Sequence, residues 1–176
     1  MFFLVASWKF SIAEMGLYAF AISAQWLIVG LVGTGPGVAI VRLSVEQLSS
    51  GNRSQAAGIA IMASATAVAL CLGIGLAAAL GVEWLHVATF SATAAVLVAA
   101  WAAGRSVLEC LRSSLLAQER YRRAAILTVS GAVAGLAALA GVVATGSLTI
   151  ERILLAHAIG QITSAVLAVG LLTPLW

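Results

Sequence analysis

Three arginines that follow or interrupt apolar stretches are the side chains best suited to chemistry in this sequence: Arg42, Arg105 and Arg112. Each has a carboxylate within helical reach, because Glu46 follows Arg42 by four residues and Glu109 lies between the other two arginines. A guanidinium binds phosphate oxygens through two parallel hydrogen bonds, so the three arginines are candidate substrate-binding residues for an anion. The alternative is structural: Arg42 snorkels to the membrane surface as an anchor paired to Glu46, and the other two belong to the solvated face of a projecting helix. The residues alone favour this structural interpretation.

Catalytic motifs are missing from the sequence. There is no HExxH, no GxSxG, no glycine-rich phosphate loop and no aspartate at all. His86 and His157 stand near the ends of predicted helices, where a lone histidine is more often a hydrogen-bonding group than a base or a metal ligand. Cys71 and Cys110 have no CxxC partner and are expected to be small buried hydrophobic residues. We therefore expect no enzyme, no cofactor, no metal and no disulfide.

The composition places all of these residues in a membrane. Of the 176 residues 62% are hydrophobic and 9% charged, and the mean hydropathy is +1.11. A soluble domain is about 45–50% apolar and roughly 25% charged, so a soluble enzyme, a nucleic-acid binder and a disordered linker are all poor interpretations. The net charge of +3 is explained by the basic bias of cytoplasmic loops. Nucleic acid is not an expected partner.

The apolar segments predict an all-α, polytopic transmembrane bundle that forms a single domain over residues 1–176. A membrane-spanning helix needs about 20 mostly apolar residues. Residues 1–9 are too short to span, lack the order of a signal peptide, and look like the outer end of a truncated first helix. The five full spans are expected at residues 15–41, 56–80, 87–104 with an amphipathic continuation through Arg112, 124–144, and 153–172.

Local patterns predict how these spans are shaped and packed. Pro36 and the glycines around it predict a bend in the first span. Leu108, Leu111 and Leu115 form a second, apolar face of the third span, apart from the face of its charged residues. Gly131 and Gly135 form a small-xxx-small motif that lets two helices approach closely. Two neutral polar residues inside spans, Gln25 and Gln161, are expected to hydrogen-bond across helices as part of the packing, with contact to a polar ligand as the alternative.

The basic residues predict the orientation. Of nine arginines and lysines, only Lys9 and Arg152 fall in the alternate connections, so the other seven lie on one side. The positive-inside rule assigns that side to the cytoplasm. The predicted localisation is therefore the cell (inner or plasma) membrane, with a multi-pass topology.

Several segments resemble the polysaccharide (oligosaccharide) flippase family of the multidrug/oligosaccharidyl-lipid/polysaccharide exporter superfamily. Residues 14–19 (EMGLYA) are similar to the start of the family's second helix. Residues 41–43 (VRL) and 48–53 (LSSGNR) are similar to its link between the second and third helices. Residues 118–121 (QERY) are similar to its link between the fourth and fifth helices.

This resemblance implies that the five spans correspond to helices two to six, the N-terminal half of a longer transporter. Members of the family are thought to move lipid-linked oligosaccharide, usually on undecaprenyl diphosphate, to the outer leaflet by alternating access. The implied partners are this lipid, membrane lipid, and a missing second helical bundle or a second chain, because one bundle cannot rock against an absent partner. It also implies that Arg42, Arg105 and Arg112 contact diphosphate or sugar.

Two alternatives remain open at this point. One is a drug or cation exporter of the same superfamily, which would be expected to show an acidic cavity. The other is a structural or assembly subunit of a membrane complex that transports nothing itself.

Overall fold

The computed structural model describes residues 2–84, 91–146 and 148–172, and within these ranges the fold is helical with no strand. Five helices are long and apolar enough to cross a membrane. The prediction of an all-α transmembrane bundle is therefore confirmed. The elements are α1 (Phe2–Lys9), α2 (Ile12–Val29), a π-helical turn η1 (Gly30–Thr34), α3 (Gly35–Ser49), α4 (Arg53–Trp84), α5 (Ala92–Ala117), α6 (Tyr121–Ala144) and α7 (Ile150–Leu172).

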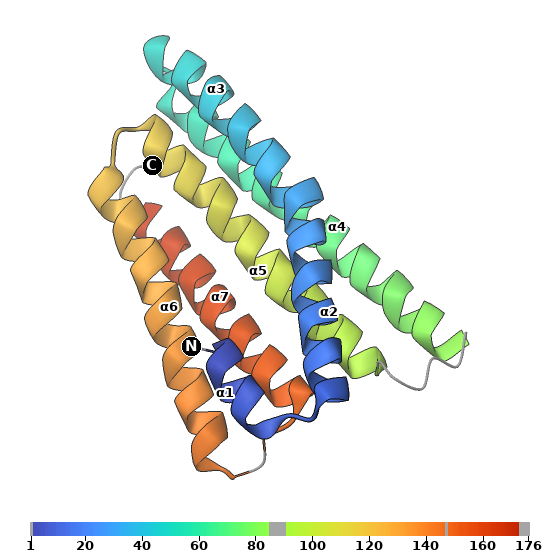
Figure 1. The fold of residues 1–176 in the computed structure, drawn as a ribbon. Coiled ribbons are helices and arrows are strands. Elements are labelled where there is room, and N and C mark those ends of the chain that lie inside the picture. Colours follow the sequence, from blue (N-terminus) through green and yellow to red (C-terminus); the bar gives the residue numbers. More distant parts are fainter. Residues whose placement is uncertain (1, 85–90, 147, 173–176) are drawn as a thin grey trace.

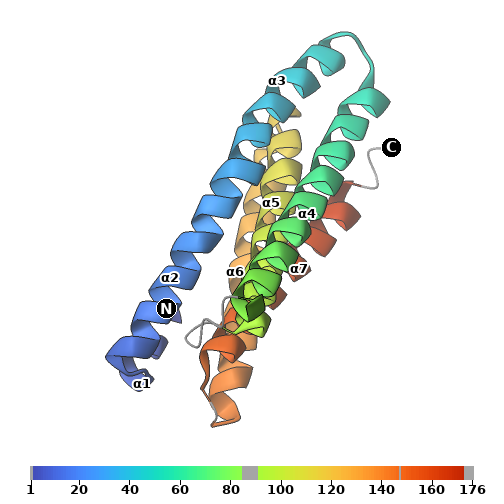
Figure 2. The same cartoon turned by 90° about the vertical axis from the view of Figure 1, so that its right-hand side faces the viewer.

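Helices α2 and α3, joined by η1, form one span, which we call the α2–α3 rod. Helix α5 runs between this rod, α4 and the hairpin of α6 and α7 (Figure 1). The α3–α4 and α5–α6 turns lie at the same end of the bundle. Most of the basic residues lie toward this end, which we call the charged end. The short helix α1 lies at the opposite end (Figure 2). The helical hairpins thus agree with the alternation of sides that the basic residues predict.

Helix α5 is the centre of the bundle because small residues cover much of its surface. In its most apolar stretch 67% of the residues are buried, compared with 22% in α4 and in α6. Alanine and glycine let neighbouring helices approach from several directions. Nearer the charged end the predicted leucine face is confirmed, since Leu108, Leu111 and Leu115 are all buried against α6 and α7.

The α2–α3 rod changes direction where a π-helical turn interrupts it (Figure 1). A proline lacks the N–H that an α-helix uses, so a wider turn just before Pro36 relieves the mismatch. The predicted bend is therefore present, and its break lies at Gly30–Thr34, directly before the proline. At this break the chain passes close to α5, because a Cβ on Gly33 would lie 3.0 Å from Ser106 Oγ.

The contact between α6 and α7 is built from small residues, as the glycine motif predicts. A Cβ on Gly160 of α7 would lie 2.7 Å from the Cα and 2.9 Å from the N of Gly135. One helical turn further on, Gly131 faces the hydroxyl of Ser164. We call these four residues the α6–α7 seam.

The helices extend past the predicted spans wherever polar residues continue the helix beyond the hydrocarbon. The first span, expected to end at residue 41, runs on to Ser49, and α4 has 32 residues. The predicted start of the third span at Val87 lies outside the described residues. The described helix begins at Ala92, where the Ser91 hydroxyl accepts a hydrogen bond from the N–H of Ala94.

Candidate functional site

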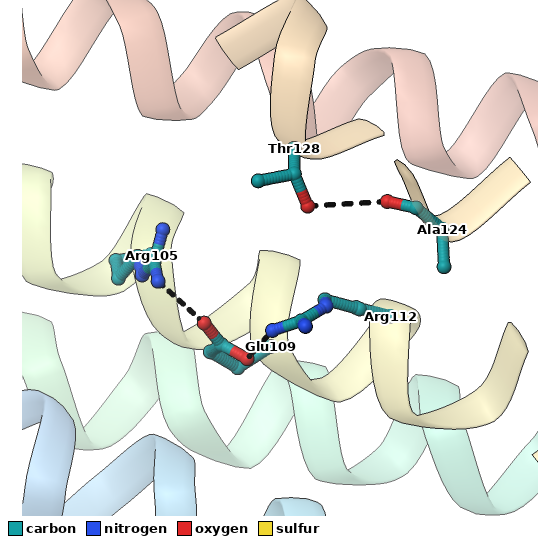
Figure 3. A network of polar contacts seen from close by, with 5 residues as sticks. All are labelled: Arg105, Glu109, Arg112, Ala124 and Thr128. Atoms are coloured by element: carbon teal, nitrogen blue, oxygen red, sulfur yellow. Dashed lines mark hydrogen bonds and ion pairs between the residues drawn. The ribbon is translucent and has the colours of Figure 1, made fainter. Parts of the chain in front are cut away.

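Arg105, Glu109 and Arg112 form a connected charged triad on α5 (Figure 3). Nη2 of Arg105 lies 2.7 Å from Oε1 of Glu109. Nη1 of Arg112 lies 3.4 Å from Oε2 of the same carboxylate. Both guanidinium groups therefore converge on one anion, although their Cα atoms lie seven residues apart on the helix, which is about 10 Å.

The amphipathic pattern of α5 decides which way the triad points. The leucine face packs on Ala124 and Leu127 of α6 and Ala168 of α7. On another side of α5, Ser106 faces Gly33 and Ser113 faces Gly37. The triad lies between these two faces around the helix, and Figure 3 shows it projecting on the side where Thr128 of α6 lies.

Packing against α7 shows how deep Arg105 lies. A Cβ on the neighbouring Gly104 would lie 3.0 Å from Cβ of Gln161, and Gln161 is the twelfth of the 23 residues of α7. A helix of 23 residues is about 35 Å long, close to the thickness of the bilayer core. Arg105 therefore lies near mid-height in the bundle, and Arg112 lies about 10 Å nearer the charged end.

The described residues leave the triad partly open. The exposed fractions of the side chains are 28% for Arg105, 21% for Glu109 and 42% for Arg112. A charge at mid-height is costly in lipid, so such a charge belongs against a water-filled cavity or another protein surface. The structural interpretation of the stripe, a helix face projecting beyond the bilayer, would instead require Arg105 to lie toward the end of the bundle.

Arg42 is placed differently. Gly37 of α3 is level with Ser113 of α5, so Arg42, five residues further along α3, is level with the end of α5. Its side chain is exposed, on the side of α3 roughly opposite the buried Ile40 and Ser44. The structure thus brings Arg105 and Arg112 together but not Arg42.

The expected pairing of Arg42 with Glu46 is wrong in this structure. Both side chains are described and exposed, and no ion pair joins them. Two exposed side chains of this kind gain little from pairing in water, because the attraction barely exceeds the entropy lost.

A second charged site lies at the turn between α5 and α6, where three arginines line a shallow hollow. Arg120, Arg122 and Arg123 surround a shallow hollow of about 400 Å³ together with Glu119 and Tyr121. Glu119 has a left-handed backbone with φ of 58°, which closes the tight α5–α6 turn. In the sequence these arginines indicate only the topology, because a run of like charges does not predict a hollow between the side chains.

Two polar groups inside the bundle behave differently from each other. His157 hydrogen-bonds across helices, since its Nε2 lies 2.9 Å from the hydroxyl of Tyr18, and its ring stacks between Phe2 and Trp101. The role of His157 as a hydrogen-bonding group is therefore confirmed, whereas His86 lies outside the described residues. For Gln161 the expected interhelical hydrogen bond fails at Oε1, which is buried without a partner. Its Cβ packs tightly on Gly104 instead.

Within the described residues, no group of three or more histidine, cysteine, aspartate or glutamate side chains is arranged to hold a metal ion. Cys71 and Cys110 are both buried, as expected for small hydrophobic residues. Comparison with protein-family models, curated proteins and solved structures finds no match to this chain. Among the described residues, the triad at mid-height of the bundle is the feature that points most directly to a function.

Proposed function

We propose that this chain is a helical bundle of a transporter that moves lipid-linked oligosaccharide across the cell membrane by alternating access. In this proposal Arg105 and Arg112 hold the diphosphate of the lipid carrier. The observation that carries the proposal is the convergence of two guanidinium groups near mid-height, on a side of α5 that is partly exposed.

The geometry of the triad suits a compact anion. The two guanidinium groups already meet at one carboxylate, so the same two groups can bind the oxygens of a diphosphate, which carries more charge. Charge-assisted hydrogen bonds from arginine to phosphate are among the strongest in proteins. A polar sugar, in turn, needs a hydrated path, because each hydroxyl without a partner costs free energy in hydrocarbon. The polyprenyl tail can stay in the lipid.

The sequence supports the same proposal independently. The resemblance to the flippase family lies in the start of α2 and in the α3–α4 and α5–α6 links, and none of these segments contains the triad. A second helical bundle or a second chain would cover the exposed side of the triad and complete the cavity.

The charge of the triad disfavours a cation exporter. Two arginines and one glutamate carry a net charge of +1, and both oxygens of the carboxylate face a guanidinium. An organic cation would be repelled from this position. An assembly subunit without transport activity would have no need for charges at this depth, which are costly to keep there.

A transport assay tests the proposal. The protein, together with the second bundle or second copy that alternating access requires, is reconstituted in liposomes with a fluorescent polyprenyl diphosphate disaccharide. The fraction that becomes accessible to an impermeant quencher is followed over time. We expect transport by the unmodified protein and at least a tenfold loss with Arg105→Gln, the size of effect expected when one strong charged contact is removed. Lys9→Gln removes the same charge from an exposed position at the other end and should transport normally.

The outcomes separate the alternatives. If folded protein moves no probe, and a neutral polyprenyl glycoside competes for binding as well as the diphosphate does, the transporter proposal is wrong. If an organic cation is transported instead, the exporter alternative replaces it.

A further inference from the structure

Glu109 is the centre of the triad, and its position raises the question of what it does when a substrate arrives. Oε1 lies 2.7 Å from Arg105 and Oε2 lies 3.4 Å from Arg112. The carboxylate therefore occupies the place between the two guanidinium groups that an anionic substrate would need. Two arginines on this partly exposed face would repel each other if no anion lay between them.

Arg105 and Arg112 are the groups whose ion pairs with Glu109 the structure describes. On α6, Thr128 lies on the side to which the triad projects (Figure 3) and donates to the carbonyl of Ala124, and Arg122 and Arg123 are in the first turn. On α7, Gln161 packs at the level of Gly104 and His157 at the level of Trp101. Cys110 is buried toward α3 and α4, with Ile40 and Ala60.

The other five glutamates lie elsewhere in the fold. Their positions are the ends of α2, α4 and α7 far from the charged end (Glu14, Glu83 and Glu151), the exposed face of α3 (Glu46) and the α5–α6 turn (Glu119).

We propose that Glu109 is an internal counter-anion that holds the two arginines in the empty state and is displaced by the anionic group of the substrate. This inference rests on the proposed function, because it assumes that a diphosphate binds to Arg105 and Arg112. It adds a competition within the site: the substrate binds by exchanging with a carboxylate of the chain itself.

The exchange makes Glu109 a competitor of the substrate for the same two guanidinium groups. No covalent bond forms or breaks in this exchange. A variant without the carboxylate charge has no such competitor, so it must bind the substrate more tightly.

Binding measurements on the purified full chain in detergent micelles test this. The probe is a fluorescent short-chain prenyl diphosphate N-acetylglucosamine, in which each phosphate carries one negative charge. We expect Glu109→Gln to bind the probe more tightly, within the roughly 5- to 150-fold range of typical coupling effects.

Two further variants make the result specific. Glu46→Gln removes the same charge from an exposed position of α3 and should bind like the unmodified protein. Glu109→Asp keeps the negative charge and should bind more weakly than Glu109→Gln. Thermal unfolding of each variant in the same micelles shows whether it is folded.

The outcomes distinguish this inference from the proposed function. If probe binding is lost in Arg105→Gln but Glu109→Gln binds equally or more weakly, Glu109 is no competitor and the inference is wrong while the function stands. If the probe does not bind to the unmodified protein, or binds independently of Arg105, both the proposed function and the inference fail.

Discussion

The α6–α7 seam and the charged triad are both contacts of the same bundle, but they are built on opposite principles. In the seam, glycines bring two backbones so close that a Cβ on Gly160 would lie 2.7 Å from Cα of Gly135. In the triad, long side chains meet on a face that stays between 21% and 42% exposed. The seam is closed, whereas the triad is open on one side.

If the chain transports as proposed, the difference indicates which parts of the bundle would change during a transport cycle. A helix pair in backbone contact moves as one body, because no side chain between the two helices can adjust. The proposed exchange at the triad would need only rotation of side chains. The aromatic cluster of Phe2, Tyr18, Trp101 and His157 joins α1, α2, α5 and α7 and belongs with the closed part.

The largest effect is expected in the seam. In Gly160→Val the new side chain would meet the backbone of Gly135, so the two helices must separate. Overpacking costs about 1–3 kcal/mol even where side chains can shift, and here the obstacle is backbone. We expect a loss of at least this size in the free energy of unfolding in detergent micelles, or no folded protein at all.

The matched control for this substitution is Gly141→Val on α6, the other helix of the seam. A Cβ at Gly141 would have nothing within 4 Å, so the same side chain should be tolerated there with little change in stability. Equal losses in the two variants would mean that the seam is no tighter than the rest of the helix surface.

A smaller effect is expected from breaking the triad. Glu109→Leu removes the anion that both arginines share and leaves two cations facing each other. Losing one partner of a buried pair costs about 3–5 kcal/mol, and an exposed pair is worth roughly 0.2–1 kcal/mol. Because the triad is partly exposed, we expect about 1–2 kcal/mol, between these limits.

Arg42→Leu serves as the comparison for that measurement, since Arg42 makes no ion pair with Glu46. Unfolding of the two variants in urea or by heat in the same detergent should show little change for Arg42→Leu. If both substitutions destabilise the protein equally, the triad is no different from an isolated surface arginine.

The α6 side of the seam and the leucine face could be predicted from the sequence, because each depends on the spacing of residues within one helix. Gly131 and Gly135 share a face by helical periodicity, and so do Leu108, Leu111 and Leu115. The same periodicity predicted that Arg105, Glu109 and Arg112 lie together. What periodicity cannot give is the level at which one helix packs on another.

The level at which α5 packs on α7 decides where Arg105 lies along the bundle. The depth of Arg105 follows from the contact between Gly104 and Gln161, two residues in different helices. In the same way, the stacking of Phe2 on His157 joins the first and last helices of the chain. Such contacts depend on the three-dimensional packing of several helices, and no short segment of the sequence encodes them.

The smallest effect is expected from Tyr18→Phe in the aromatic cluster. The substitution removes the hydroxyl that lies 2.9 Å from Nε2 of His157 but keeps the ring, which is only 1% exposed. Hydrogen bonds between membrane helices contribute about 0.6 kcal/mol on average, and the stacked rings of Phe2 and Trp101 still hold the imidazole. We therefore expect a loss of about 0.6 kcal/mol in unfolding free energy, with Tyr121→Phe at an exposed position as the control. A loss as large as that of Glu109→Leu would show that the closed part depends on this polar contact as much as the open part depends on its ion pairs.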